Sequence, residues 1–151
     1  FTGASKRLEL LANNAHCNIY GDFAHAPSKV IATIEAVKQQ FPSRKLIGVL
    51  ELHTYSSLNK EFMHQYKGAL EKTDIAVVFY SKHALQIKGL PELPESYVVE
   101  GFDKNGLLVM TDKNALENWL RAQDYSNTNL VLMSSGNYDG IDLPSFAPTL
   151  I

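Results

Sequence analysis

The sequence predicts an α/β fold: a Rossmann-like, mainly parallel sheet with helices on both faces, preceded by a short N-terminal hairpin. Short apolar runs alternate with stretches of helical period, as βαβ units require. The strand-like runs are almost continuously apolar, which is typical of strands buried in parallel sheets. A chain of 151 residues, 45% hydrophobic and 20% charged, suits one globular domain over 1–151.

Individual elements follow from local pattern. Two apolar runs, 8–12 and 17–20, flank Asn13-Asn14 and predict the hairpin, because asparagine tolerates the backbone of tight turns. Pro27 suits the first turn of a helix, and apolar residues recur after it at helical spacing. The other elements expected are strands at 45–51, 74–80, 97–99, 107–110 and 129–133, helices at 58–73, 84–87 and 114–122, and an irregular tail at 143–151.

The predicted topology gathers polar loops at one edge of the sheet. Right-handed crossovers place all strand-to-helix loops together, where open α/β sheets bind ligands. Asp22 and His25 lie in the first of these loops, and two readings stay open for them. They either stabilise the helix entry or contact a ligand through a carboxylate and an imidazole. The loops expected at this edge are 22–27, 51–57, 80–83 and 134–139.

Charge and cysteine content exclude whole classes of function. A net charge of −2 and a pI near 6.2 give no overall attraction to nucleic acid or anionic membranes, which excludes a strongly basic binder but not a local patch that binds phosphate. No apolar stretch approaches the roughly 20 residues that span a bilayer. Cys17 is the single cysteine, so no internal disulfide forms and no cysteine metal site is expected. We therefore expect a cytoplasmic protein with no nucleic-acid or membrane partner. Because the chain begins at Phe1, we expect a piece of a longer protein.

Nucleotide and hydrolase signatures are missing. There is no GxGxxG after a strand, no GxxxxGK[ST] loop and no GxSxG elbow. A nucleotide would therefore meet this domain from one side only. Ser134 or Ser135 with His25 or His53 offers a nucleophile and a base, but a serine that ends a strand is more often a loop or cap residue. No catalytic residue is assigned.

Specific motifs resemble a known family. Arg7 and Glu9 stand in the context Gly-x-x-Lys-Arg-Leu-Glu, and Asp22 follows fifteen residues after Arg7 in Asp-Phe-Ala-His-x-Pro. With Leu130 to Gly140, these motifs resemble the C-terminal domain of Mur ligases, from about Gly3 to Gly140. Within that family they look closest to the branch that recycles murein peptides.

The resemblance implies an ATP-dependent amide ligase of three domains. Its N-terminal UDP-binding and central ATPase domains would lie outside this chain, and the central one would hold ATP and Mg²⁺. The C-terminal domain would close over the nucleotide and present the incoming peptide. Partners of the full-length enzyme would be UDP-N-acetylmuramate, a murein tripeptide and the central domain in cis. This domain alone is expected to bind no cofactor and to be inactive.

By position, the resemblance assigns Arg7, Asp22 and His25 to the nucleotide. Where relatives that add alanine carry arginines for its carboxylate, this chain has Thr54 and Ser57. That departure favours a peptide over free L-alanine, because no guanidinium fork remains to hold a small carboxylate. Ala26 also departs from the family pattern. The residues assigned to substrate are His53, Tyr55, Ser56, Ser57, Ser135, Gly136 and Asn137.

Two alternatives stay open. The first is the ligase that adds L-alanine to UDP-N-acetylmuramate, within the same family. The second is a stand-alone α/β module that binds a ligand without catalysis.

Overall fold

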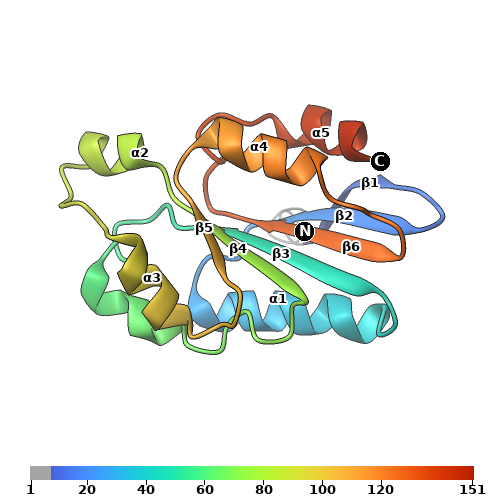
Figure 1. Cartoon of the computed structure of the whole chain (residues 1–151), viewed down its shortest axis with the longest axis horizontal. Helices are drawn as coiled ribbons and strands as arrows, with labels where there is room; N and C mark the ends of the chain where they lie inside the picture. Colours follow the sequence, from blue (N-terminus) through green and yellow to red (C-terminus); the bar gives the residue numbers. More distant parts are fainter. Residues whose placement is uncertain (1–7) are drawn as a thin grey trace, which may run out of the picture.

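A computed structural model describes residues 8–151 and shows one six-stranded sheet between two layers of helices (Figure 1). The strand order is β1-β2-β6-β3-β4-β5, and only β1 runs antiparallel to its neighbour. The strands are β1 (Glu9–Asn13), β2 (Cys17–Asp22), β3 (Lys45–Glu51), β4 (Ile75–Phe79), β5 (Leu108–Met110) and β6 (Thr128–Met133). The helices are α1 (Pro27–Gln40), α2 (Lys82–Ile87), α3 (Glu95–Phe102), α4 (Lys113–Arg121) and α5 (Leu143–Phe146), with 3₁₀ helices η2 (Lys60–Tyr66) and η3 (Ala147–Leu150).

The last strand in the sequence lies in the middle of the sheet. β6 pairs with β2 on one side and with β3 on the other, parallel to both. Its final residue, Met133, is in register with Asp22 of β2 and with Leu50 of β3. The loops that follow these three strands therefore begin side by side at one edge, as the sequence predicts.

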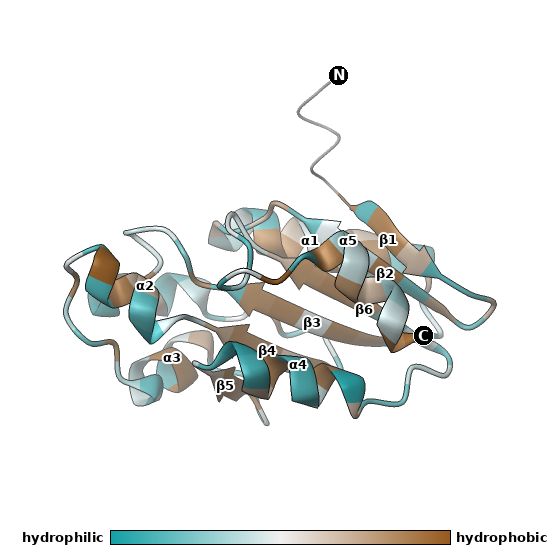
Figure 2. Ribbon diagram, turned by 90° about the horizontal axis from the view of Figure 1, so that it is seen from above, coloured by the Kyte–Doolittle hydropathy of each residue, from teal (hydrophilic) through white to brown (hydrophobic). Residues whose placement is uncertain are grey.

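Helices cover both faces of the sheet. α1, η2 and α3 lie on one face and α4 and α5 on the other (Figure 1). Colouring by hydropathy shows apolar strands and an α4 whose outer side is hydrophilic (Figure 2). Each face has its own core, one containing Ile34, Val78 and Phe102 and the other Val77, Leu116 and Tyr138. The predicted fold class is confirmed.

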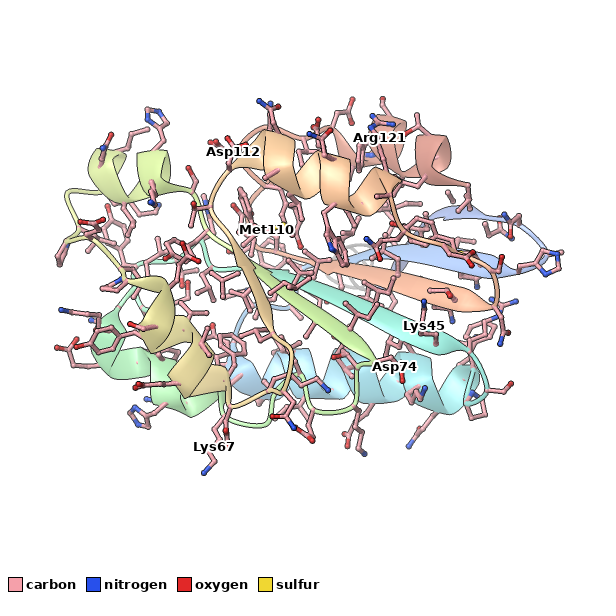
Figure 3. All side chains as sticks on the ribbon, in the orientation of Figure 1. Lys45, Lys67, Asp74, Met110, Asp112 and Arg121 are labelled. Carbon is pink, nitrogen blue, oxygen red and sulfur yellow. The ribbon has the colours of Figure 1, made fainter. Side chains whose placement is uncertain are left out.

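α4 shows how a helix is fixed to this framework. Asp112 and Arg121 mark its two ends (Figure 3). The Asp112 carboxylate accepts a hydrogen bond from the Ala115 backbone N–H at 2.9 Å, which caps the helix. The Arg121 guanidinium lies 4.8 Å above the ring of Phe146 in α5. Sequence pattern predicted α4 because its apolar residues recur at helical spacing.

Three predicted elements are wrong. The helix expected over 58–73 is the shorter η2 followed by turns, because Gly68 has φ +79°, which a right-handed helix does not accommodate. The strand expected at 97–99 belongs to α3, whose Val98 and Phe102 are one helical turn apart and fully buried. The tail at 143–151 forms α5 and η3, with a proline in the first turn of each, where a missing N–H costs nothing.

None of the helices within residues 8–151 has the length and apolar character needed to cross a membrane. Arg7, like the rest of the Gly3–Glu9 motif before Leu8, lies outside the described residues. The expected role of Arg7 therefore stays a prediction.

Candidate functional site

Asp22 ends β2 and is buried at the edge of the sheet where the loops after β2, β3 and β6 begin. One carboxylate oxygen accepts the Ala24 backbone N–H at 2.7 Å, and the other accepts the Leu8 N–H at 2.9 Å. Its own backbone carbonyl accepts the Ser134 N–H at 3.0 Å, which ties β2 to the loop after β6. Asp22 therefore holds the helix entry in place, and each carboxylate oxygen keeps lone-pair capacity for a further donor.

His25 lies at the start of the same turn. Its Nδ1 is 3.0 Å from the Phe23 carbonyl oxygen, so in the neutral imidazole Nδ1 carries the proton and Nε2 is an acceptor. The Tyr66 hydroxyl donates to the His25 backbone carbonyl at 2.6 Å, and burial raises the pKa of Tyr66 to about 12. Asp22, Phe23, His25 and Lys29 line a pocket of about 220 Å³ at the N-terminus of α1, which we call the helix pocket.

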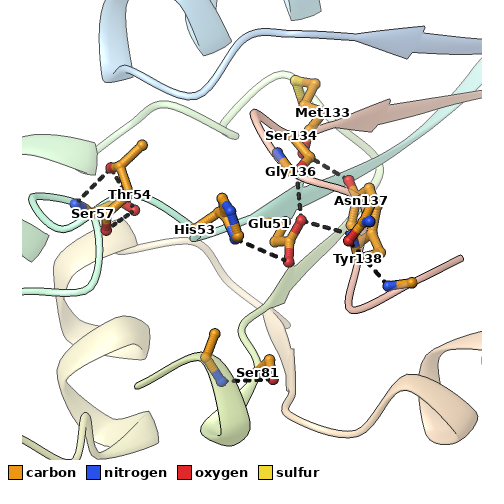
Figure 4. Close-up of polar contacts among 12 residues, drawn as sticks. Glu51, His53, Thr54, Ser57, Ser81, Met133, Ser134, Gly136, Asn137 and Tyr138 are labelled. Atoms are coloured by element: carbon orange, nitrogen blue, oxygen red, sulfur yellow. Dashed lines mark hydrogen bonds and ion pairs between the residues drawn. The ribbon is translucent and has the colours of Figure 1, made fainter. Parts of the chain in front are cut away.

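Glu51, the last residue of β3, is the centre of a second polar cluster (Figure 4). Only 2% of its side chain is exposed. One carboxylate oxygen, Oε1, accepts the Ser134 hydroxyl at 2.5 Å and the Tyr138 backbone N–H at 2.8 Å. The other, Oε2, lies 3.9 Å from Nδ1 of His53. A single buried carboxylate thus joins the loop after β3 to the loop after β6.

The loop after β6 is rigidly held. Tyr138 is fully buried, and its hydroxyl lies 2.7 Å from the Met133 carbonyl oxygen and 3.0 Å from that of Val49. Burial, which removes water from around the phenol, and the nearby Glu51 carboxylate hold the pKa of Tyr138 well above its usual range. Since Ser134 donates to Glu51 and not to a histidine, the geometry gives no support to serine as a nucleophile.

His53 is packed against the backbone of this loop. A Cβ built on Gly136 would lie 2.8 Å from ring carbons of His53, closer than real contacts. His53 is therefore placed by Gly136 on one side and by Glu51 near Nδ1. The side chain is 37% exposed, so it borders the solvent while its orientation is fixed.

The residues predicted to form one substrate loop have different surroundings in the structure. The Thr54 hydroxyl is within 3.0 Å of that of Ser57, and the Ser57 N–H donates to Thr54 Oγ1 at 3.1 Å. Ser57 is buried, so these hydroxyls build the turn. Ser56 lines a separate hollow beside η2, together with Phe62. Tyr55 is exposed, and the Lys88 ammonium lies 5.0 Å from the centre of its ring.

The residues expected in the last substrate loop also differ in their surroundings. The Ser135 hydroxyl oxygen is buried and has no hydrogen-bond partner among residues 8–151. The Asn137 side-chain oxygen accepts the Gly140 N–H at 3.0 Å. Asn137 is exposed, and its side chain supports the turn while remaining accessible.

These residues line three neighbouring hollows at the same edge of the sheet. Asp22 and Gly136 line one of about 230 Å³ with Ser134 and Leu143, next to the helix pocket. A third, of about 170 Å³, lies between the ends of β3, β4 and β6, and we call it the α2 pocket. It is lined by Glu51, His53, Ser81, His83, Ala84, Ile87, Lys88, Asn137 and Asp139. Asp22 and His25 therefore come together, as do His53 and Asn137.

Glu51, Lys88 and Tyr138 have no role in the sequence-based expectations. The signal for Glu51 is its charge at the end of an apolar strand, where the predicted 51–57 loop begins. Nothing in the sequence pattern brings Lys88, at the end of α2, close to Tyr55. Within residues 8–151 no group of three or more His, Cys, Asp and Glu side chains is arranged to hold a metal ion.

A family profile described as the glutamate ligase domain of Mur ligases matches residues 6–136. The chain belongs to the Mur ligase family. The matched segment covers all six strands and the residues Asp22, His25, Glu51 and His53, and it ends before Asn137, Tyr138 and α5. The family resemblance seen in the sequence motifs is thereby confirmed.

Curated relatives match this domain over a part of their length. A UDP-N-acetylmuramate–L-alanine ligase from Magnetococcus marinus is 32% identical over 78 residues, 52% of this chain and 16% of that protein. One of the same name from Ruthia magnifica is 26% identical over 149 residues, 95% of this chain and 31% of that protein. The chain therefore spans less than a third of the length of these relatives.

Solved structures share the fold. A domain of a putative UDP-N-acetylmuramate:L-alanyl-γ-D-glutamyl-diaminopimelate ligase from Haemophilus ducreyi has a TM-score of 0.69 at 21% identity, covering 96% of this chain and 100% of that one. A murein peptide ligase from Psychrobacter arcticus has a TM-score of 0.73 at 16% identity, covering 97% of this chain and 30% of that one. At these identities the likeness is one of fold.

Proposed function

We propose that this chain is the C-terminal domain of an ATP-dependent amide ligase that joins a murein peptide to UDP-N-acetylmuramate in cell-wall recycling. The observation that carries the proposal is the family match over residues 6–136, combined with two polar pockets at one edge of the sheet. The helix pocket takes part of the nucleotide, and the α2 pocket takes the acceptor. The fixed loop after β6 lies between them.

The residues of the helix pocket fit a nucleotide. Asp22 and His25 offer acceptors for ribose hydroxyls, and Lys29 adds a positive charge for phosphate. Because the pocket is about 220 Å³ and open on one side, we assign only part of the nucleotide to it. ATP supplies the phosphoryl group that activates the muramyl carboxylate, and the rest of the ligase would hold that group with Mg²⁺.

On the acceptor side, the α2 pocket favours a peptide over free L-alanine. The hydroxyls of Thr54 and Ser57 bond to each other and to the backbone, so this turn offers no charged fork for a small carboxylate. His53, Asn137 and the α2 side chains instead line a hollow of about 170 Å³.

A second candidate is the ligase that adds L-alanine. The curated relatives named above are UDP-N-acetylmuramate–L-alanine ligases, and this observation favours the second candidate. The structural neighbours share the fold with both kinds of ligase, so the first candidate is supported by the Thr54–Ser57 turn and not by the fold. Both candidates share the nucleotide side and differ only in the acceptor.

Acceptor-dependent ligation decides between them. The full-length polypeptide that carries this domain is incubated with ATP and UDP-N-acetylmuramate, and with either L-alanyl-γ-D-glutamyl-diaminopimelate or L-alanine. We expect product and ADP with the tripeptide and at most a trace with alanine. A clear preference for alanine supports the second candidate. No acceptor-dependent ADP with either would refute both and favour a binding module.

A further inference from the structure

The α2 pocket has charges of both signs, and its one lysine has no carboxylate beside it. Lys88 is half-buried at the end of α2, and within residues 8–151 no carboxylate oxygen lies within 4.0 Å of its ammonium. Its contact is the ring of Tyr55, 5.0 Å away, which leaves the charge itself unneutralised. An anion is the ligand that this position favours.

The acidic residues of the pocket lie on its other walls. Glu51 comes from the end of β3 and uses Oε1 for Ser134 and Tyr138. Asp139 is exposed on the loop after β6. A ligand with a carboxylate toward Lys88 and an ammonium toward Asp139 would match the charges on both walls. Amino-acid and peptide ends carry these two groups.

Neighbouring donors on the predicted substrate loop are already used. The Ser57 hydroxyl donates to the Thr54 carbonyl at 3.0 Å, and its N–H donates to Thr54 Oγ1. Thr54 and Ser57 therefore offer no charged donor, and His53 is the residue that the loop after β3 adds to the lining. The lysine of the pocket, Lys88, comes from the end of α2, next to the exposed His83.

We propose that Lys88 binds a carboxylate of the last residue of the incoming peptide. The proposal rests on the proposed function and names the group of the acceptor that this pocket recognises. Lys88 lines the pocket and its ammonium also lies 5.0 Å from the ring of Tyr55; in the proposed complex the ammonium donates to the carboxylate.

The test compares acid and amide acceptors in the full-length ligase. The acceptors are L-alanyl-γ-D-glutamyl-diaminopimelate and the same tripeptide with both carboxylates of its last residue converted to carboxamides. For the wild type, we expect the KM of the amide to be about tenfold that of the acid, the loss typical of one charge-assisted hydrogen bond. Lys88→Gln should raise the KM of the acid about tenfold and leave that of the amide unchanged.

Lys82→Gln is the matched control, because Lys82 is exposed on the same helix and does not line the pocket. It should keep the acid-to-amide ratio of the wild type. If Lys88→Gln keeps that ratio as well, the assignment of Lys88 is wrong. Absence of any ligation refutes the proposed function instead.

A binding measurement on the 151-residue chain tests Lys88 without ligation. The acid tripeptide is titrated into isotope-labelled protein, and amide shifts of His53, Lys88 and Asn137 are followed. We expect shift changes in the wild type that are lost or weakened about tenfold in Lys88→Gln. Equal affinity of the two proteins for the acid tripeptide would overturn the proposal.

Discussion

The imidazole of His53 lies so close to Gly136 that a Cβ on residue 136 would be 2.8 Å from its ring carbons. Gly136→Ala should therefore push His53 away from Glu51. Because His53 is 37% exposed, it can turn outward, and we expect a loss of about 1 kcal/mol in the free energy of unfolding. Denaturant unfolding measures the loss, and imidazole NMR signals report the displaced ring.

A double-mutant cycle isolates this contact. In a His53→Ala background, Gly136→Ala should cost almost nothing, because the atoms it would meet are gone. An equal cost in both backgrounds would mean that strain elsewhere in the loop is responsible.

Glu51→Ala should destabilise the domain by about 2–4 kcal/mol, since it leaves the Ser134 hydroxyl and the Tyr138 N–H without their shared acceptor. Glu51→Gln keeps an oxygen for these donors and should cost clearly less. The comparison is made by denaturant unfolding, with the exposed Glu61→Ala as control. Equal stability of Glu51→Ala and wild type would refute the role of this carboxylate.

Asp22→Asn tests how much Asp22, which is predicted to bind nucleotide, contributes to the stability of the fold. An amide offers one oxygen, so either the Leu8 or the Ala24 N–H would face an NH₂ group. We expect a loss of about 1–3 kcal/mol in the free energy of unfolding even without nucleotide. The exposed Asp139→Asn should leave it unchanged. A fully stable Asp22→Asn protein would show that the carboxylate is free to serve the ligand alone.

Alkaline pH should weaken the fold through Tyr66. Burial raises its pKa from 10.0 to about 12, so the folded state keeps a proton that the unfolded chain has already lost. The contribution of Tyr66 to the free energy of unfolding is therefore fully present below pH 10, and it is lost as the pH rises from 10 toward 12. Tyr66→Phe should lower stability at pH 8, since the His25 carbonyl loses its donor, and should make the alkaline decline shallower.

Denaturant unfolding at pH 8, 10 and 11 measures this decline. Tyr55→Phe is the control, because Tyr55 is 61% exposed and its phenol is not held by the fold. A Tyr66→Phe protein that declines as steeply as the wild type would contradict the assignment.

The sheet, and the edge at which its strand-to-helix loops meet, were predictable from the sequence because their signals are local. Buried parallel strands are continuous apolar runs, such as the one ending at Glu51, and Pro27 marks the start of α1. Right-handed connections then determine which loops share an edge. The family motifs added expected roles for Asp22 and His25, roles that stay predictions.

The errors arise where tertiary contacts or backbone conformation decide. Val98 and Phe102 are buried by packing against another segment, and Tyr97–Val99 alone is too short to show a helical period. Gly68 ends a helical pattern by its left-handed backbone, which its surroundings select. The pairing of Lys88 with Tyr55 joins α2 to a distant loop, and no local pattern predicts it.

The division of the edge into a nucleotide side and an acceptor side is the central claim, and steady-state kinetics of the full-length ligase tests it most directly. His25→Ala leaves the loop in place, because Tyr66 holds the His25 backbone carbonyl, and Asn137→Ala changes an exposed side chain of the α2 pocket. The apparent KM for ATP and for the tripeptide is measured in each variant. We predict that His25→Ala raises the KM for ATP alone and Asn137→Ala the KM for the tripeptide alone. Variants that leave both constants unchanged, or raise both equally, would contradict the account.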